Sequence, residues 1–335
     1  MKVSSKFISL KEYIPLGKPS LSNFELNEKS LDFKNLDDVL VSNSWISVDP
    51  YMRARMTERK NYKPPFDINE PMEGAAIGKV IKSNSLKFQE GDIVLSDCGW
   101  RDNFITNSSK LKKINPIDIP LQTYLGPLGM TGHTAYTGLF QIANIQNKQT
   151  VLVSSAAGSV GSIVCQIAKN LGCKVIASTG SDTKVKWLIN EIGVDHAFNY
   201  NNIDNLVLYL KEIEPEGFDL YFDNVGGNFL ESTIYRMKNY GKIVICGRIS
   251  QMNTTEANGG LKNIAHILVK RLTMRGFLIF DHLEDTKKFE NDMENWILNK
   301  QIKWKETIRE GIENAPQAFI DLLDGKNIGK MLVKI

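Results

Sequence analysis

Cysteine and histidine are scarce in this chain of 335 residues, which contains four of each. The cysteines are Cys98, Cys165, Cys173 and Cys246, and they do not show the dense, even spacing of a disulfide framework. The histidines are His133, His196, His266 and His282. They are isolated, and no CxxC or HxxxH pair occurs, although a catalytic zinc ion normally takes three protein ligands. The sequence therefore predicts no metal site, the alternative being a zinc site assembled from distant residues by tertiary contacts alone.

The sequence also lacks a large excess of one charge and a long apolar run. Lys and Arg total 41 against 38 Asp and Glu, a net charge of +3, and the basic residues are scattered. We therefore expect no nucleic-acid partner. No apolar run reaches the length of a membrane-spanning helix, and residues 1–11 lack the apolar core of a signal peptide. We expect a cytoplasmic protein without a membrane segment.

The distribution of strand and helix patterns predicts two domains, as does a length above the usual limit for one hydrophobic core. Residues 1–125 contain short extended runs broken by turns and prolines, which is typical of a mainly β domain. From residue 126 onward, six strands alternate with helix-length segments, which predicts a doubly wound parallel (Rossmann) sheet. One of these helices is predicted at 229–237 and the last strand at 274–280. The C-terminal strand is expected to return to the first domain. The predicted division is 1–125 with 301–335, and 126–300.

A glycine-rich turn gives the clearest functional signal. Residues 150–155 form a short apolar run, Gly158 and Gly161 follow, and a helical pattern then continues to Gly172. Backbone N–H groups at the start of such a helix bind a pyrophosphate. Ala156 replaces the first glycine of the dinucleotide fingerprint, so ordinary turn chemistry is the alternative. The strand before it and the βα alternation after it favour a dinucleotide.

The second strand of this domain indicates which dinucleotide binds. NAD-binding relatives of the fold place an acidic residue at its end, but here Gly180 follows the strand and Lys184 comes shortly afterwards. A lysine there can bind a 2′-phosphate, so NADP(H) is predicted. Alternatively, Lys184 lies on a solvated helix face beside Lys186. Asp182 is expected to cap this helix.

Two polar clusters outside the glycine turn are candidate site segments. Tyr51 lies in a polar turn at residues 48–56, where it would act as a hydrogen-bond donor or acid, or else pack with its hydroxyl bound to the backbone. Asn224 follows a predicted buried strand and would face the cofactor, because open α/β sheets bind ligands at the carboxyl ends of strands. Residues 246–250 follow the next strand in the same way. For both segments after strands, the alternative is plain turn formation.

Several motifs in order resemble one family. They are VDPYMR at 48–53, GMTGHTAY at 129–136, AAGSVG at 156–161, GSDTK at 180–184, FDNVGG at 222–227, ICGRIS at 245–250 and NIGK at 327–330. Together they resemble the zinc-independent medium-chain dehydrogenase/reductases, in the branch of the prostaglandin reductases, leukotriene hydroxydehydrogenases and alkenal double-bond reductases. The resemblance extends over essentially the whole chain.

This resemblance implies a GroES-like first domain, a Rossmann domain that binds NADPH, and a homodimer. The residues that it places at the cofactor are Thr134, Gly158, Ser159, Val160, Gly161, Gly180, Lys184, Tyr200, Asn224, Cys246, Gly247, Ser250, Phe277, Leu278, Ile279 and Asn327. Zinc-containing relatives carry a Gly-His-Glu motif where this chain has Pro71-Met-Glu-Gly74. The resemblance therefore agrees with the absence of a predicted metal site.

The family reaction is hydride transfer from the nicotinamide to the β-carbon of an enone or enal, which places negative charge on the carbonyl oxygen. A hydrogen-bond donor at that oxygen lowers the barrier. The family commonly has a tyrosine two residues beyond the ICGxIS motif, but this chain has Met252 there. The donor would then be Tyr51, a cofactor ribose hydroxyl or water. The alternatives are reduction of a quinone, and an NADPH-binding protein without catalysis that recognises RNA or another partner.

Overall fold

The computed structural model of the chain describes residues 2–115, 118–253 and 260–335. It divides into two compact units, which we call unit 1 (residues 1–125 and 306–335) and unit 2 (residues 126–305). The second crossing between them follows Lys305, five residues after the boundary expected from the sequence. Within the described ranges, none of the helices has both the length and the apolar character needed to cross a membrane.

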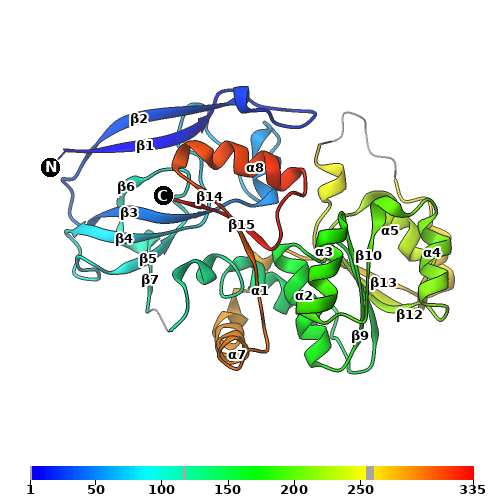
Figure 1. Cartoon of the computed structure of the whole chain (residues 1–335). Helices are drawn as coiled ribbons and strands as arrows, with labels where there is room; N and C mark the ends of the chain where they lie inside the picture. The colour runs from blue at the N-terminus through cyan, green and yellow to red at the C-terminus, as the bar shows by residue number, and fades with distance from the viewer. Residues whose placement is uncertain (1, 116–117, 254–259) are drawn as a thin grey trace. The chain divides into compact units, whose positions relative to one another are not determined.

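Unit 1 is built around strand β3 (Asp38–Ser47), which pairs with three other strands. The neighbours of β3 are β4 (Ala76–Ser83), β6 (Asn103–Asn107) and β15 (Lys330–Lys334). The sheet continues with β5 (Ile93–Ser96), β7 (Lys112–Ile114) and β14 (Glu306–Glu310), in the order β14-β15-β3-β4-β5-β7 with β6 on β3. Strands β1 (Lys2–Leu10) and β2 (Phe24–Asp32) form a separate antiparallel pair (Figure 1). The C-terminal strand therefore lies within the sheet of unit 1.

The core of unit 1 depends on that C-terminal segment. Helix α8 (Ala315–Leu323) contributes Phe319, which makes an edge-to-face contact with Trp100 at a centroid distance of 6.2 Å. Met331 and Val333 of β15 are fully buried in the same cluster. Residues far apart in the sequence thus complete one hydrophobic core.

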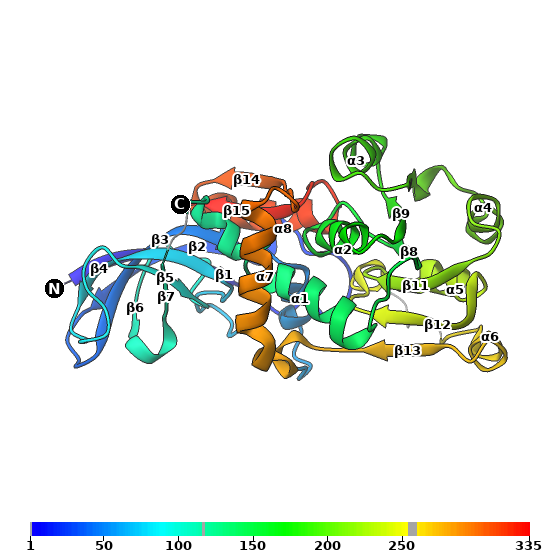
Figure 2. The same cartoon turned by 90° about the horizontal axis from the view of Figure 1, so that it is seen from below.

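Unit 2 contains a parallel sheet of six strands in the order β10-β9-β8-β11-β12-β13. The strands are β8 (Thr150–Val153), β9 (Lys174–Thr179), β10 (His196–Asn199), β11 (Phe218–Asp223), β12 (Met237–Ile245) and β13 (Thr273–Gly276). The described helices of this unit are α1 (Met130–Thr137), α2 (Ser159–Asn170), α3 (Asp182–Trp187), α4 (Leu206–Ile213), α5 (Gly227–Ile234), α6 (Ile264–Val269) and α7 (Thr286–Leu298) (Figures 1 and 2). The strand order reverses between β8 and β11, as in doubly wound dinucleotide folds. The predicted Rossmann fold is confirmed.

Two elements of unit 2 differ from the sequence prediction. A strand was expected over 274–280, but β13 ends at Gly276 and a 3-10 turn occupies Ile279–Asp281. A helix was expected to reach Met237, but α5 ends at Ile234 and Met237 pairs with Phe218 as the start of β12. In both places backbone pairing with a neighbouring strand decides the boundary, and local periodicity does not report that pairing.

Candidate dinucleotide site

Most of the predicted cofactor residues of unit 2 follow the carboxyl end of a strand. The turn at 154–161 follows β8, Gly180 follows β9, Tyr200 follows β10, Asn224 follows β11, residues 246–250 follow β12, and residues 277–279 follow β13. Because all pairs in this sheet are parallel, these segments share one edge. Ligands of open α/β sheets bind at this edge, where the strand order reverses.

The glycine turn brings helix α2 very close to the end of strand β8. Ser155 has a φ of 49°, and the N–H of Ala156 donates to the carbonyl of Ser178 on β9 at 2.9 Å. A Cβ atom at Gly161 would lie 2.5 Å from the Ser155 oxygen and 2.8 Å from the Ala156 Cα. Gly161 is thus required by this close approach, while alanine at position 156 is accommodated, with its side chain fully buried.

The N-terminus of helix α2 has the geometry of an anion site. Gly158 is the N-cap residue and has no side chain to accept a hydrogen bond from the first turn. The N–H groups of that turn can therefore bind phosphate oxygens, and the helix dipole favours the negative charge. Ser159 Oγ donates to Thr131 Oγ1 at 2.7 Å, which links this turn to helix α1. The residues present fit a pyrophosphate.

At the end of β9, Gly180 is covered by Tyr200. A Cβ atom at Gly180 would lie 3.0 Å from the Tyr200 hydroxyl, and Asn201 Nδ2 donates to the Gly180 carbonyl at 2.9 Å. Lys184 is half-buried, and that burial lowers the pKa of its ammonium group. A partly desolvated cation is stabilised by a bound anion, so this position fits the 2′-phosphate of NADP(H).

The expected cap of helix α3 was wrong. Ser181, rather than Asp182, is the N-cap residue, and its Oγ accepts a hydrogen bond from the Lys184 N–H at 3.4 Å. The Asp182 carboxylate instead accepts hydrogen bonds from Asn199 Nδ2 at 2.9 Å and Asn202 Nδ2 at 3.3 Å. Side chains at the end of the neighbouring strand β10 and just after it therefore hold the Asp182 carboxylate.

The loops after β11 and β12 are joined by hydrogen bonds. The Asp223 carbonyl accepts from the N–H groups of Cys246 at 2.9 Å and Gly247 at 3.0 Å. Ser250 Oγ donates to the Val225 carbonyl at 2.7 Å, and Asn224 Nδ2 donates to the Ser154 carbonyl at 2.8 Å. Asn224 therefore joins the β11 loop to the glycine turn. This is a structural role beside the cofactor role predicted for it.

A buried carboxylate that the sequence analysis did not single out organises this region. Asp223 Oδ1 accepts hydrogen bonds from the Tyr221 hydroxyl at 2.6 Å, from the N–H groups of Val225 and Gly226 at 2.9 Å each, and from Ser154 Oγ at 3.2 Å. Burial raises the pKa of Asp223, against the effect of these donors. The position of Asp223 within the FDNVGG motif is the sequence feature that could have identified it as a site residue.

Cys246 is not a nucleophile in this arrangement. Burial, with a smaller contribution from the Asp223 charge, raises the pKa of its thiol to about 12. The reactive form of cysteine is the thiolate, which is then scarce at neutral pH. Its predicted contribution to the cofactor site would come from its backbone.

The other predicted residues of unit 2 are placed as follows. Thr134 lies on helix α1 and its Oγ1 donates to the Met130 carbonyl at 2.8 Å, so its hydroxyl is bonded within its own helix. The Phe277 ring packs near Gly138, where a Cβ atom would lie 3.2 Å away. Leu278 is partly exposed and Ile279 is buried. The structure places the last two in the segment after β13.

Tyr51 and Asn327 lie in unit 1. Tyr51 is in the 3-10 helix Pro50–Met56, packs against the core, and has Lys63 Nζ 5.2 Å from its ring centroid. Burial raises the pKa of its hydroxyl well above 10.0, and the charges of Asp49 and Asp97 add to this effect. Asn327 is buried and its Nδ2 donates to the Gly329 carbonyl at 2.8 Å.

Residues 71–74, where the resemblance placed the counterpart of a zinc-ligand motif, form other interactions. Glu73 accepts a hydrogen bond from Arg55, with 2.7 Å between Oε2 and Nη2. Arg55 also stacks over the Phe66 ring at 4.1 Å. Among the residues that the structure describes, no three His, Cys, Asp or Glu side chains gather as metal ligands would.

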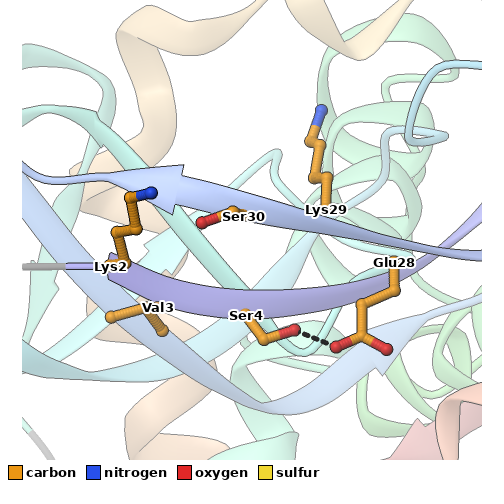
Figure 3. Close-up of a pocket in the computed structure, with 6 residues that line it drawn as sticks. All are labelled: Lys2, Val3, Ser4, Glu28, Lys29 and Ser30. Carbon is orange, nitrogen blue, oxygen red and sulfur yellow. Dashed lines mark hydrogen bonds between the residues drawn. The ribbon is translucent and has the colours of Figure 1, made fainter.

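A surface hollow of about 300 Å³ lies on the β1–β2 pair of unit 1 (Figure 3). Its lining residues are Lys2, Val3, Ser4, Glu28, Lys29 and Ser30, and Ser4 Oγ donates to Glu28. None of the predicted site residues lines it. We assign it no role in the chemistry.

Comparisons with known proteins decide the family. Residues 6–114 match the model of the N-terminal domain of oxidoreductases, and residues 159–321 match that of zinc-binding dehydrogenases. The chain is 40% identical to the NADP(+)-dependent 2-alkenal reductase of Nicotiana tabacum, over 100% of this chain and 98% of the relative. It is 41% identical to prostaglandin reductase 1 of Bos taurus, over 99% of both. This chain belongs to the zinc-independent branch of the medium-chain dehydrogenase/reductases. The family predicted from the motifs is confirmed.

Solved structures of medium-chain dehydrogenase/reductases agree with this assignment. CurA from Vibrio vulnificus, solved in complex with NADPH, matches with a TM-score of 0.92 and 34% identity over 98% of both chains. A quinone oxidoreductase from Escherichia coli matches with a TM-score of 0.78 and 21% identity, which shows a shared fold. The predicted combination of a Rossmann sheet with a mainly β GroES-like domain is therefore confirmed.

Proposed function

We propose that this protein reduces the C=C bond of α,β-unsaturated ketones and aldehydes with NADPH. The observation that carries the proposal is the half-buried cation of Lys184 after β9, on the sheet edge that also holds the glycine turn. That edge fits a dinucleotide with a 2′-phosphate. The class of acceptor follows from full-length similarity to the 2-alkenal and prostaglandin reductases.

The proposed roles of the residues in unit 2 follow from their geometry. The N–H groups of Ser159, Val160 and Gly161 bind the pyrophosphate, and Lys184 pairs with the 2′-phosphate. The two loops joined at Asp223 line the site after β11 and β12. The bound cofactor supplies a hydride for the β-carbon of the acceptor. Gly180 and Tyr200 lie against each other, and they would line the ribose site.

We assign Tyr51 as the donor to the carbonyl oxygen of the acceptor. Negative charge develops on that oxygen during reduction, and a donor placed there stabilises it. Because the pKa of Tyr51 is raised, its hydroxyl keeps its proton throughout the neutral range and up to at least pH 10.0. Replacement by phenylalanine should lower kcat by about 100- to 1000-fold. Ionisation of Tyr51 should cause no loss of kcat below that pH.

The test is a panel of enones, enals and quinones in which oxidation of NADPH is followed and the products are identified. We expect saturated ketones and aldehydes as products, with NADPH preferred over NADH. Turnover of quinones with no reduction of enones would select the quinone-reductase alternative. Tight NADPH binding with no acceptor reduced, together with salt-sensitive RNA binding, would select the non-catalytic alternative.

A variant at Met252 can be measured in the same enone assay. It directly follows the 3-10 turn Ile249–Gln251 and is half-buried. A thioether cannot donate a hydrogen bond. We expect Met252→Tyr to raise kcat on enones, because it restores a donor common in the family. An unchanged or lower kcat would show that the missing hydroxyl does not limit this enzyme.

We also propose a cytoplasmic homodimer. All four cysteines are free, which is usual in a reducing compartment. In unit 2, β13 is an edge strand, and Ile264, Leu268 and Val269 on the nearby helix α6 are each at least 63% exposed. An exposed apolar patch beside an open strand edge is typical of a protein interface. Light scattering after size exclusion would measure the mass of the particle.

A further inference from the structure

A buried ion pair joins the first and the last of the motifs noted in the sequence. Lys330 Nζ lies 2.9 Å from Asp49 Oδ1, and each side chain is only 4% exposed. Asp49 belongs to the 48–53 motif and Lys330 to the 327–330 motif, 281 positions apart. Both residues belong to unit 1. Removing a charge from water costs free energy unless the charge is fully paired, so this buried pair requires an explanation.

Both partners are almost completely satisfied by hydrogen bonds. Lys330 Nζ also donates to the carbonyl oxygens of Val48 at 2.9 Å and Met331 at 3.2 Å. The second carboxylate oxygen of Asp49 accepts from Ser47 Oγ. The ammonium group thus has three acceptors, and it holds the backbone before Pro50 as well as the carboxylate.

The position of Asp49 gives the pair its significance. Asp49 is the N-cap of the 3-10 helix that carries Tyr51, but its side chain makes no capping hydrogen bond. An aspartate at this position normally accepts from the N–H groups of its own helix. Here the carboxylate binds Lys330 and Ser47, so a residue of strand β15 holds the N-cap residue of this helix.

The other end of the pair is equally constrained. Lys330 is the first residue of β15. In the turn before it, the N–H of Ile328 donates to Thr307 Oγ1 of β14 at 3.0 Å. Asn327 is buried and bonded to Gly329 within the same turn. The pair therefore connects the segment of Tyr51 to the segment of Asn327, and each is a predicted site residue.

We propose that Asp49 and Lys330 form a positioning pair that holds the Tyr51 helix and the Asn327 turn in the arrangement needed to reduce the acceptor. The inference rests on the proposed function, in which Tyr51 donates to the carbonyl oxygen. Neither member of the pair touches the acceptor. They act through Tyr51, whose hydroxyl must lie within hydrogen-bond distance of one developing charge, and a displacement of about 1 Å can lower the rate about 100-fold.

The test is a double-mutant cycle between Lys330→Met and Tyr51→Phe, with kcat measured at saturating NADPH. We expect Lys330→Met to lower kcat by about 10- to 100-fold and to change KM for the enone much less. In the Tyr51→Phe background the same substitution should have a far smaller effect on kcat. Equal fold-losses in both backgrounds would overturn the proposal, as would an unchanged kcat in Lys330→Met.

Arg309→Met is the matched control. Arg309 pairs with the buried Asp321 at 2.6 Å, also in unit 1, and neither residue belongs to the hydrogen-bond network of Asp49 and Lys330, which includes Ser47, Val48 and Met331. This control should keep kcat close to that of the wild type. If Lys330→Met fails to fold, the double variant Asp49→Asn/Lys330→Met removes both charges and should fold with the same loss of kcat. Wild-type kcat in that double variant would overturn the proposal.

A second measurement separates this inference from the proposed function. Hydrogen exchange of the peptide spanning residues 47–56 reports how firmly the Tyr51 helix is held, whether or not enones are reduced. We expect faster exchange there in Lys330→Met than in Arg309→Met. Equal exchange in the two variants would refute the positioning role. Absence of enone reduction by the wild-type protein would instead refute the proposed function.

Discussion

At the scale of single residues, we propose that Lys184 and Gly180 together distinguish NADPH from NADH. Gly180 follows β9 where a carboxylate would bind the ribose hydroxyls, and the nearby Asp182 carboxylate accepts hydrogen bonds from Asn199 and Asn202. Lys184 is half-buried, and this burial lowers the pKa of its ammonium group. A doubly charged phosphate can compensate that desolvation, whereas a ribose hydroxyl cannot.

We predict that Lys184→Ala weakens NADPH binding by about 10- to 100-fold, the usual effect of removing one charged hydrogen-bonding partner. NADH binding should change much less, since NADH has no 2′-phosphate. Isothermal titration with both cofactors measures the two dissociation constants.

The matched control for that titration is Lys186→Ala. Lys186 lies on the same helix but is exposed, and it should leave both constants nearly unchanged. Equal losses of NADPH and NADH affinity in Lys184→Ala would show that this lysine does not bind the phosphate.

At the scale of elements, the glycine turn and helix α2 form the most constrained part of unit 2. The Cβ distances show that the two glycines of this turn have different functions. Gly161 permits backbone contact between the helix and the turn. Gly158 ends the turn and leaves the first N–H groups of the helix open to an anion. Both were identified by the same motif, but only the structure separates their roles.

We predict that Gly161→Ala destabilises the protein, toward the upper end of the about 1–3 kcal/mol usual for overpacking. The new methyl group would lie 2.5 Å from a backbone oxygen, which cannot move as freely as a side chain. Gly158→Ala is the control, because its Cβ would lie 3.2 Å from the same oxygen and the expected loss is about 1 kcal/mol or less. Urea unfolding of both variants measures the difference, and equal losses would contradict this explanation.

At the scale of the whole molecule, the two units differ in how the chain builds them. Unit 2 is a continuous segment with its own parallel sheet, whereas unit 1 needs residues from both ends of the chain. Strand β15 lies between β14 and β3, and Met331, Leu332 and Val333 are each at most 1% exposed. Without the C-terminal segment, β3 would lose its neighbour β15 and the hydrophobic core of unit 1 would be exposed to solvent.

We therefore predict that a fragment of residues 126–305 folds alone and unfolds cooperatively. A fragment of residues 1–125 should show no cooperative transition, since its sheet and core are incomplete. Thermal melts followed by near-ultraviolet circular dichroism distinguish these outcomes. A cooperative melt of the 1–125 fragment would show that strands β14 and β15 are dispensable for unit 1.

The sequence by itself determined the parallel α/β architecture, the glycine turn, the preference for NADP(H) and the family. These properties depend on local periodicity, on turn-forming residues and on motifs that are continuous in the chain. Strand boundaries such as the end of β13 were less accurate, because they depend on pairing with a neighbour.

Only the tertiary structure decided which side chains meet. The hydrogen bonds at Asp223, the cap at Ser181 and the pair between Asp49 and Lys330 depend on strand order and on the orientation of buried polar groups. Each forms because a polar group removed from water must find a partner wherever the fold places one. For Lys330 that partner lies 281 positions away, a separation at which no local sequence pattern can indicate contact.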